Sequence, residues 1–284
     1  MLNAVSDAFL DTVKVFPFLL ASYLFIEYIE HRAGEKLTSA LYSLGWKGPF
    51  LGALTGVFPI CGLAVSAADL FANRLISPGT LTAALIACSD EAILVLFSTP
   101  GVRTSSFLLC SVKFILGFVF GLLADVLFRH ENDAAHAHEE HDHLHEHCDE
   151  NECEEQGILM TALKHTLTSS LFILATAIIL EILFDTIGTE TVSGFFHSSS
   201  SFHPLIAVLL GLIPNCAPSI ILSEFYIEGL IGFGAMTAGL VINAGVGLAV
   251  LWKQNHRVRE SLLLTLYLSG VAIIAGYVLP LFLS

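Results

Sequence analysis

Two cysteines and two acidic residues occupy matching positions in apolar sequence, and their side chains are of types that bind metal ions. Cys61 precedes Asp69 by eight residues, and Cys216 precedes Glu224 by eight residues. Thiolates bind soft metals such as zinc, whereas carboxylates bind harder ions such as Mn²⁺. The repeated spacing therefore predicts two copies of one ion-binding unit, with packing residues as the alternative for the cysteines.

A proline lies two residues before each cysteine, at Pro59 and Pro214. Proline lacks the N–H group that an α-helix needs and clashes with the preceding turn, so it ends or breaks a helix. We expect each proline at the tip of a helical hairpin, where one half-helix ends with unpaired carbonyl groups and the next begins with unpaired N–H groups. Asn215 adds an amide oxygen to the second tip. Such tips can bind an ion of either charge.

Further polar residues lie inside the apolar blocks that follow. Asp90 and Glu91 are adjacent, and Asn243 lies in the corresponding block of the second half. Lys113 lies eight residues into the next block, at about the depth of Asp90, because a helix rises about 1.5 Å per residue. We expect Lys113 to pair with Asp90 or Glu91, which leaves the other acid available to a substrate. The alternative is a buried ion pair that only fixes the helices.

The elements that position these residues are membrane helices. The chain has 284 residues, of which 55% are hydrophobic and 13% are charged, a composition too apolar for an ordinary soluble domain. Its hydrophobic residues form eight blocks, each long enough for the roughly 20 residues with which a helix crosses a bilayer. The blocks span residues 8–30, 48–73, 78–99, 105–128, 161–187, 203–227, 230–252 and 260–283. We predict an all-α, multi-pass protein of the cell (cytoplasmic) membrane.

The second half of the chain repeats the first. An offset of 155 residues aligns the prolines, the cysteines and the acids of the two motifs without a gap. An offset of 154 aligns Glu27 with Glu181, which lie near span ends where side chains can reach water and are weaker candidates for the ion pathway. We predict membrane repeat 1 over residues 1–129, a loop over 130–157 and membrane repeat 2 over 158–284.

The distribution of basic residues predicts the orientation of the repeats. If each proline motif is a hairpin that enters and leaves on one side, each repeat has three full spans and one hairpin. The repeats are then inverted, and the chain makes ten helical passes. With the N-terminus outside, the basic residues on the cytoplasmic side are Arg32, Lys36, Lys47, Arg74, Arg129, Lys164, Lys253, Arg257 and Arg259, and the exceptions are Lys14, Arg103 and Lys113. The positive-inside rule favours this arrangement, which is the usual one in secondary transporters. The alternative is that the prolines only kink two spans in a protein without a transport role.

The segment between the repeats has the composition of a metal-binding tract. Residues 130–156 contain seven histidines, eleven acidic residues and two cysteines, and much of the net charge of −14 lies there. We expect this cytoplasmic segment to be disordered without metal. Its candidate ligands, suited to zinc, nickel or copper, are His136, His138, His141, His143, His145, His147, Cys148 and Cys153. A solubilising acidic linker is the alternative.

With the paired motifs GVFPICG and GLIPNCAP, the whole-chain repeat and the His-rich linker, the sequence resembles the ten-span heavy-metal exporter family, whose members are also described as manganese transporters or arsenic efflux proteins. The likeness covers essentially the full chain. Ten spans agree with eight blocks when each hairpin counts as two passes. The resemblance implies metal export and assigns no ligand to any residue.

We therefore predict a transporter that exports divalent metal cations, with manganese as the first candidate. We expect it to be secondary-active, because the chain has no Walker-type ATP motif. A permease for arsenite, organoarsenicals or a softer metal such as zinc is the alternative, and a metal-sensing membrane subunit is a further one. We expect no enzymatic activity, because HExxH and a recognisable nucleophile–base signature are both missing. We expect no cofactor and no nucleic-acid partner. The expected partners are the metal ion and the lipid bilayer, and a homo-oligomer is left open.

Overall fold

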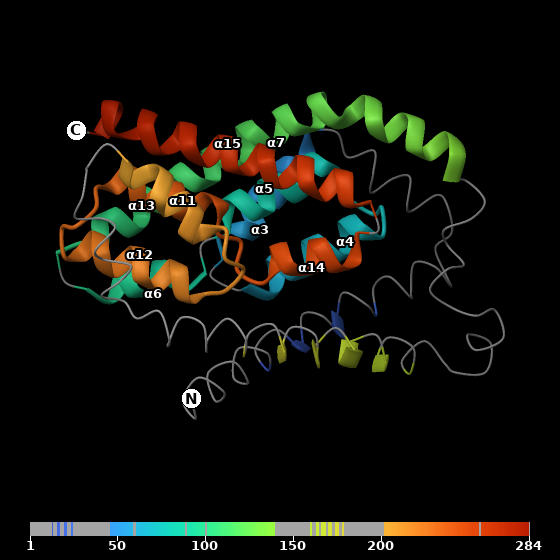
Figure 1. The fold of residues 1–284 in the computed structure, drawn as a ribbon, viewed down its shortest axis with the longest axis horizontal. Helices are drawn as coiled ribbons and strands as arrows, with labels where there is room; N and C mark the ends of the chain where they lie inside the picture. The colour runs from blue at the N-terminus through green and yellow to red at the C-terminus, as the bar shows by residue number, and fades with distance from the viewer. Residues whose placement is uncertain are drawn as a thin grey trace.

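The structure, a computed structural model, describes residues 46–58, 61–88, 90–99, 101–139, 202–255 and 257–283, with isolated positions between 13 and 24 and between 160 and 178. The regular secondary structure of this part of the chain is helical, as predicted. The helices are α3 (Lys47–Gly56), α4 (Cys61–Ala72), α5 (Pro78–Ala87), α6 (Asp90–Ser98), α7 (Arg103–Glu139), α11 (His203–Gly211), α12 (Ala217–Ile227), α13 (Phe233–Ile242), α14 (Gly247–Gln254) and α15 (Val258–Leu283) (Figure 1).

The helices of the two halves follow one another in the same order. α5 and α13 begin 155 residues apart, at Pro78 and Phe233, and each has 10 residues. α7 and α15 also begin 155 residues apart, at Arg103 and Val258. The sequence repeat therefore corresponds to a repeated unit of two short helices, a helix broken in two and a long helix.

The first motif folds as a helical hairpin. α3 runs parallel to α5, because Gly48 lies against Thr80 near the start of α5 and Gly56 lies against its end. α4 follows α3 and leads back to Ser77, whose hydroxyl group is 2.9 Å from that of Thr80. The chain therefore leaves and returns at the same end of α5.

The second motif folds in the same way. Gly211, the last residue of α11, lies against Gly239 and Ile242 at the end of α13. Near the end of α12, the ring of Tyr226 packs edge-on against Phe233, the first residue of α13, with ring centroids 6.0 Å apart. α12 therefore leads back from the end of α13 to its start, as α4 does for α5.

Two helices that were predicted as full spans are broken in their middle. α5 ends at Ala87 and α6 begins at Asp90, while α13 ends at Ile242 and α14 begins at Gly247. In the second break, the side-chain oxygen of Asn243 accepts a hydrogen bond from the N–H of Gly245 at 2.9 Å. Such an Asx turn offers the backbone an alternative to the helix. By length and composition, residues 78–98 and 233–254 each remain candidates for one membrane crossing.

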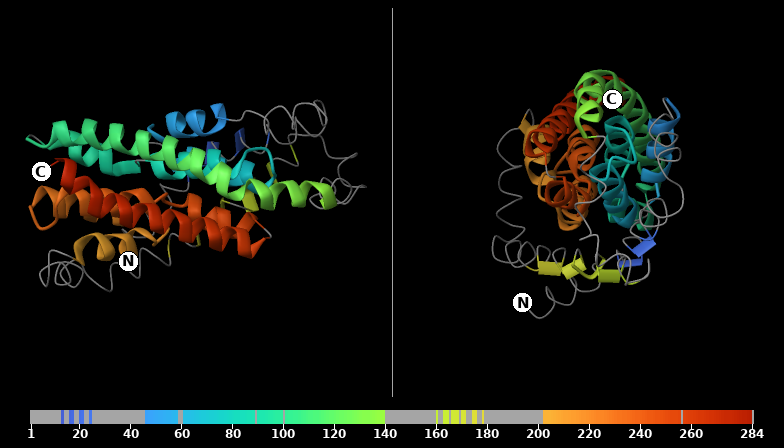
Figure 2. Two further views of the ribbon diagram at one scale, coloured as in Figure 1. Left: turned by 90° about the horizontal axis from the view of Figure 1, so that it is seen from above. Right: turned by 90° about the vertical axis from the view of Figure 1, so that its right-hand side faces the viewer.

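The long helices α7 and α15 lie side by side and run in opposite directions, as Figures 1 and 2 show. The hydroxyl group of Tyr267 on α15 donates a hydrogen bond to the carbonyl oxygen of Phe120 on α7 at 2.8 Å. The rings of Tyr267 and Phe128 pack edge-on with centroids 5.8 Å apart. α7 packs against α5 and α15 packs against α13, so the two broken helices lie between the long helices and the hairpins.

The apolar part of α7 ends before the helix does. Its candidate membrane span covers Arg103–Phe128, but the helix continues to Glu139. The helix therefore extends through residues 130–139, the first ten residues of the segment predicted as a loop, and the predicted boundaries of the two repeats stay predictions. Residues 140–157 lie outside the part of the chain that the structure describes.

Candidate ion site at the helix breaks

The C-terminal ends of four helices meet in the middle of the described part of the molecule. Gly56 at the end of α3 lies against Ala87 and Cys88 at the end of α5. In the second half, the end of α11 lies against the end of α13 in the same way. Lys113 on α7 connects the two groups, because its ammonium group contacts both α5 and α13. Each hairpin tip therefore lies beside a helix break.

Lys113 is completely buried at this meeting point. Its ammonium group donates hydrogen bonds to the carbonyl oxygen of Cys88, the residue that ends α5, and to that of Leu240 in the last turn of α13, the latter at 2.6 Å. These carbonyl groups carry the partial negative charge of a helix C-terminus, which a cation stabilises. Lys113 therefore joins the ends of two half-helices from different repeats.

The predicted ion pair of Lys113 with Asp90 or Glu91 stays a prediction. The two acids form the first turn of α6, immediately after the break that Lys113 contacts, and their side chains lie outside the described part. The sequence did not suggest the contact of Lys113 with main-chain carbonyl groups, because these become available only where the helices break.

Asn243 contributes an unsatisfied donor to the site. The residue is 2% exposed, and its side-chain oxygen is used by Gly245. Its Nδ2 group makes no hydrogen bond to any residue that the structure describes. An unsatisfied buried donor costs roughly 1–3 kcal/mol. Among the described residues, Asn243 thus keeps this donor group available at the helix break.

The second hairpin tip is built from buried polar residues. Asn215 and Cys216 are both buried, and the side-chain oxygen of Asn215 accepts a hydrogen bond from the N–H of Cys216 at 2.6 Å. The hydroxyl group of Ser219 donates to the carbonyl oxygen of Cys216 at 2.7 Å, which fixes the first turn of α12. Of the first tip, Cys61 begins α4 without a described side chain, and Pro59 lies outside the described residues.

Asp69 and Glu224 occupy equivalent positions in different surroundings. Asp69 is completely buried in α4, which packs against α14, and its carboxylate interacts electrostatically with the ammonium group of Lys253 on α14. Glu224 on α12 is exposed. The structure therefore does not bring the two acids into one environment. The interaction of Lys253 with Asp69 was not predicted, and Lys253 was expected only to lie on the cytoplasmic side.

An open groove of about 420 Å³ begins beside the second hairpin tip. Pro214 and Leu212 line it together with Trp252 and Lys253 of α14. The groove therefore connects the second hairpin tip with Lys253, which interacts electrostatically with Asp69.

The described residues hold no group of three or more His, Cys, Asp or Glu side chains that could bind a metal ion. Several predicted ligands lie outside these residues, namely Glu27, Glu181, His141, His143, His145, His147, Cys148 and Cys153. The backbone of His136 and His138 belongs to the last turns of α7. The loop therefore stays a predicted metal tract.

The apolar helices and the buried polar residues at their breaks define a multi-pass helical membrane protein. The chain belongs to the ArsP_2 family, described as a putative 10TM heavy-metal exporter, whose model matches it over residues 1–159 and 136–283. The family resemblance seen in the sequence is confirmed. No curated protein and no solved structure matches the chain.

Proposed function

We propose that this protein exports heavy-metal ions from the cytoplasm as a secondary-active transporter, with the helix breaks as its ion site. The observation that carries the proposal is the meeting of four helix ends around Lys113, Cys216 and Asn243 in a chain of a heavy-metal exporter family. Interrupted helices supply carbonyl and N–H groups to an ion inside a membrane without exposing them to lipid. The protein acts without a cofactor and without enzymatic chemistry.

The same proposal includes inverted repeats in the cell membrane, with the N-terminus outside. The opposite directions of α7 and α15, which begin at equivalent positions, support the inverted relation of the repeats. The hairpin geometry of α3 with α4 and of α11 with α12 also supports it. Such a pair of repeats can open the ion site to either side in turn.

Manganese is the first substrate that we propose. The buried ammonium group of Lys113 repels a divalent cation, by roughly 7 kcal/mol at 5 Å and an effective dielectric constant of about 20. A manganese site therefore needs Asp90 and Glu91, whose backbone begins α6 beside Lys113. These carboxylates would supply the hard oxygen ligands that Mn²⁺ prefers and offset the charge of Lys113.

Arsenite is the second candidate, and the unsatisfied Nδ2 group of Asn243 favours it. Arsenite is neutral near pH 7, carries oxygen acceptors and binds thiols, so Lys113 would not repel it. Cys216 supplies a buried thiol at the adjacent tip. Arsenite would therefore use the donors and the sulfur of the site rather than its acids.

Cellular metal content, measured by mass spectrometry in cells with and without the protein, tests both substrates. The cells are exposed separately to Mn²⁺, Zn²⁺, Cd²⁺ and arsenite. A manganese exporter lowers cellular manganese and loses this effect in Asp90→Asn with Glu91→Gln, but keeps it in Cys61→Ser with Cys216→Ser. If the protein instead lowers cellular arsenite, and this effect is lost in Cys61→Ser with Cys216→Ser but kept in Asp90→Asn with Glu91→Gln, arsenite replaces manganese as the proposed substrate. Unchanged content of every metal refutes export.

A further inference from the structure

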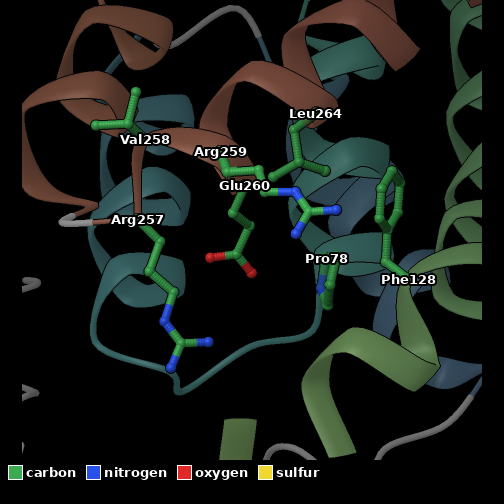
Figure 3. A pocket seen from close by; sticks show the side chains of 7 residues that line it. All are labelled: Pro78, Phe128, Arg257, Val258, Arg259, Glu260 and Leu264. Atoms are coloured by element: carbon green, nitrogen blue, oxygen red, sulfur yellow. The ribbon is translucent and has the colours of Figure 1, made fainter. Parts of the chain in front are cut away.

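A second cavity, of about 410 Å³, lies at the end of the molecule where α5 and α15 begin (Figure 3). Its lining residues are Pro78, Phe128, Arg257, Val258, Arg259, Glu260 and Leu264. Three of these residues mark the ends of candidate membrane spans: Pro78 begins one, Phe128 ends one and Val258 begins one. The cavity therefore lies where apolar helices meet polar sequence, which is the level of the lipid headgroups.

Among the described side chains around this cavity, arginines outnumber carboxylates. Arg257 and Arg259 line the cavity together with Glu260, which is held by Arg74 in a two-point ion pair at 2.9 and 2.8 Å. Asp125 is the nearby carboxylate on α7, and it accepts hydrogen bonds from the main chain and the hydroxyl group at the start of α5. Of these described residues, Arg74 is paired with Glu260, and Arg257 and Arg259 are the two guanidinium groups that line the cavity itself.

The arginines stand beside an apolar wall. Figure 3 shows Arg259 extending from the start of α15 toward Pro78 and Phe128, with the carboxylate of Glu260 between the two arginines in this view. Val258, which is 64% exposed, adds apolar surface. Planar guanidinium groups bind phosphate through paired hydrogen bonds, and the N-terminus of α15 carries partial positive charge.

We propose that this cavity binds the phosphate group of an anionic phospholipid, with the upper part of an acyl chain against Phe128. Free phosphate has the same headgroup chemistry but no acyl chain, so the apolar wall favours the lipid. The site goes beyond the proposed transport function and does not depend on it. Its position next to the ion pair of Arg74 and Glu260 places a lipid where the first hairpin is attached to α15.

Native mass spectrometry of the purified full-length protein with added phosphatidylglycerol or phosphatidylcholine tests the site. The native protein should retain phosphatidylglycerol in preference to phosphatidylcholine. Arg257→Gln with Arg259→Gln should weaken phosphatidylglycerol binding by roughly thirtyfold, which corresponds to ~2 kcal/mol for two basic residues at an anionic surface. Arg257→Lys with Arg259→Lys keeps the charges and should retain more lipid than the glutamine pair.

Arg103→Gln is the matched control. Arg103 begins α7 at the position that corresponds to the start of α15, but its guanidinium group packs on Phe97, away from this cavity. This variant should bind phosphatidylglycerol as the native protein does. Phe128→Ala should weaken binding of the lipid without affecting binding of inorganic phosphate. Displacement of the lipid by millimolar phosphate, with no effect of Phe128→Ala, would assign the site to free phosphate and overturn the lipid. Equal binding by the native protein and the glutamine pair would refute the site.

Discussion

At the scale of single residues, equivalent positions of the two repeats share a backbone but differ in chemistry. Asp69 is buried and interacts with Lys253, whereas Glu224 is exposed. Lys113 contacts the ends of two half-helices, whereas its counterpart at the same offset is Leu268, a buried apolar residue. The two halves of an ion pathway built from these repeats are therefore not interchangeable.

Asp69 is expected to act on the transported ion and not only on Lys253. Asp69→Asn should lower metal uptake into everted vesicles, whose cytoplasmic face is outside, by about tenfold, or ~1.4 kcal/mol, because it removes a buried carboxylate that interacts with Lys253 of the groove. The double variant Asp69→Asn with Lys253→Gln separates the two roles. It removes both members of the electrostatic pair, so recovery of uptake in the double variant would reduce Asp69 to a structural partner.

Lys113 is expected to stabilise the fold through the two helix ends. Lys113→Leu, which introduces the residue of the second repeat, leaves the carbonyl groups of Cys88 and Leu240 without their donor. Each buried unsatisfied group costs roughly 1–3 kcal/mol, so the thermal midpoint of the purified protein should fall by about 5 °C or more. Leu268→Met, which replaces the residue at the equivalent position by one of similar volume, is the control. Equal midpoints for Lys113→Leu and the native protein would contradict this role.

At the scale of elements, the hairpins followed from local sequence and the breaks of α5 and α13 did not. Proline interrupts a helix through its own covalent structure, so the two tips could be predicted from Pro59 and Pro214. The break after Cys88 contains no proline, and Lys113 satisfies its carbonyl group from another helix. In the second break, Asn243 and Gly245 form a turn, and these two residues were a signal for the break in the sequence. The apolar composition around them obscured that signal. Polar contacts between distant helices therefore account for what the sequence could not predict.

Close helix packing in the two hairpin units depends on glycine. A side chain at Gly52 would meet the carbonyl oxygen of Thr80, and one at Gly211 would meet that of Gly239. Gly52→Ala and Gly211→Ala should each destabilise the protein by about 1–3 kcal/mol through overpacking, measured as thermal midpoints in one detergent. Gly270→Ala on α15 is the control, since nothing lies within 4 Å of the added carbon. If all three variants have the same thermal midpoint, close packing does not determine the stability of the hairpins.

At the scale of the whole molecule, the structure gathers basic residues that are far apart in the sequence at one end. Arg74 pairs with Glu260, and Lys253 interacts with Asp69. Arg257 and Arg259 line the cavity beside this ion pair. The other end is held by a neutral hydrogen bond between the hydroxyl groups of Ser105 and Tyr226 at 2.9 Å. The charge pattern that suggested the orientation in the sequence is therefore a feature of one end of the folded molecule.

This asymmetry predicts that the end with Arg74, Lys253 and Arg257 faces the cytoplasm, because basic residues are retained on that side of the membrane. Single cysteines are introduced into a variant without the six native cysteines, after its metal efflux has been verified. Val258→Cys marks the basic end and Glu228→Cys, at the exposed end of α12, marks the other. An impermeant thiol reagent should label Glu228→Cys in intact cells and Val258→Cys only after permeabilisation. Labelling of Val258→Cys from outside would reverse the orientation, and the groove beside Pro214 would then lead to the outer face instead of the cytoplasm.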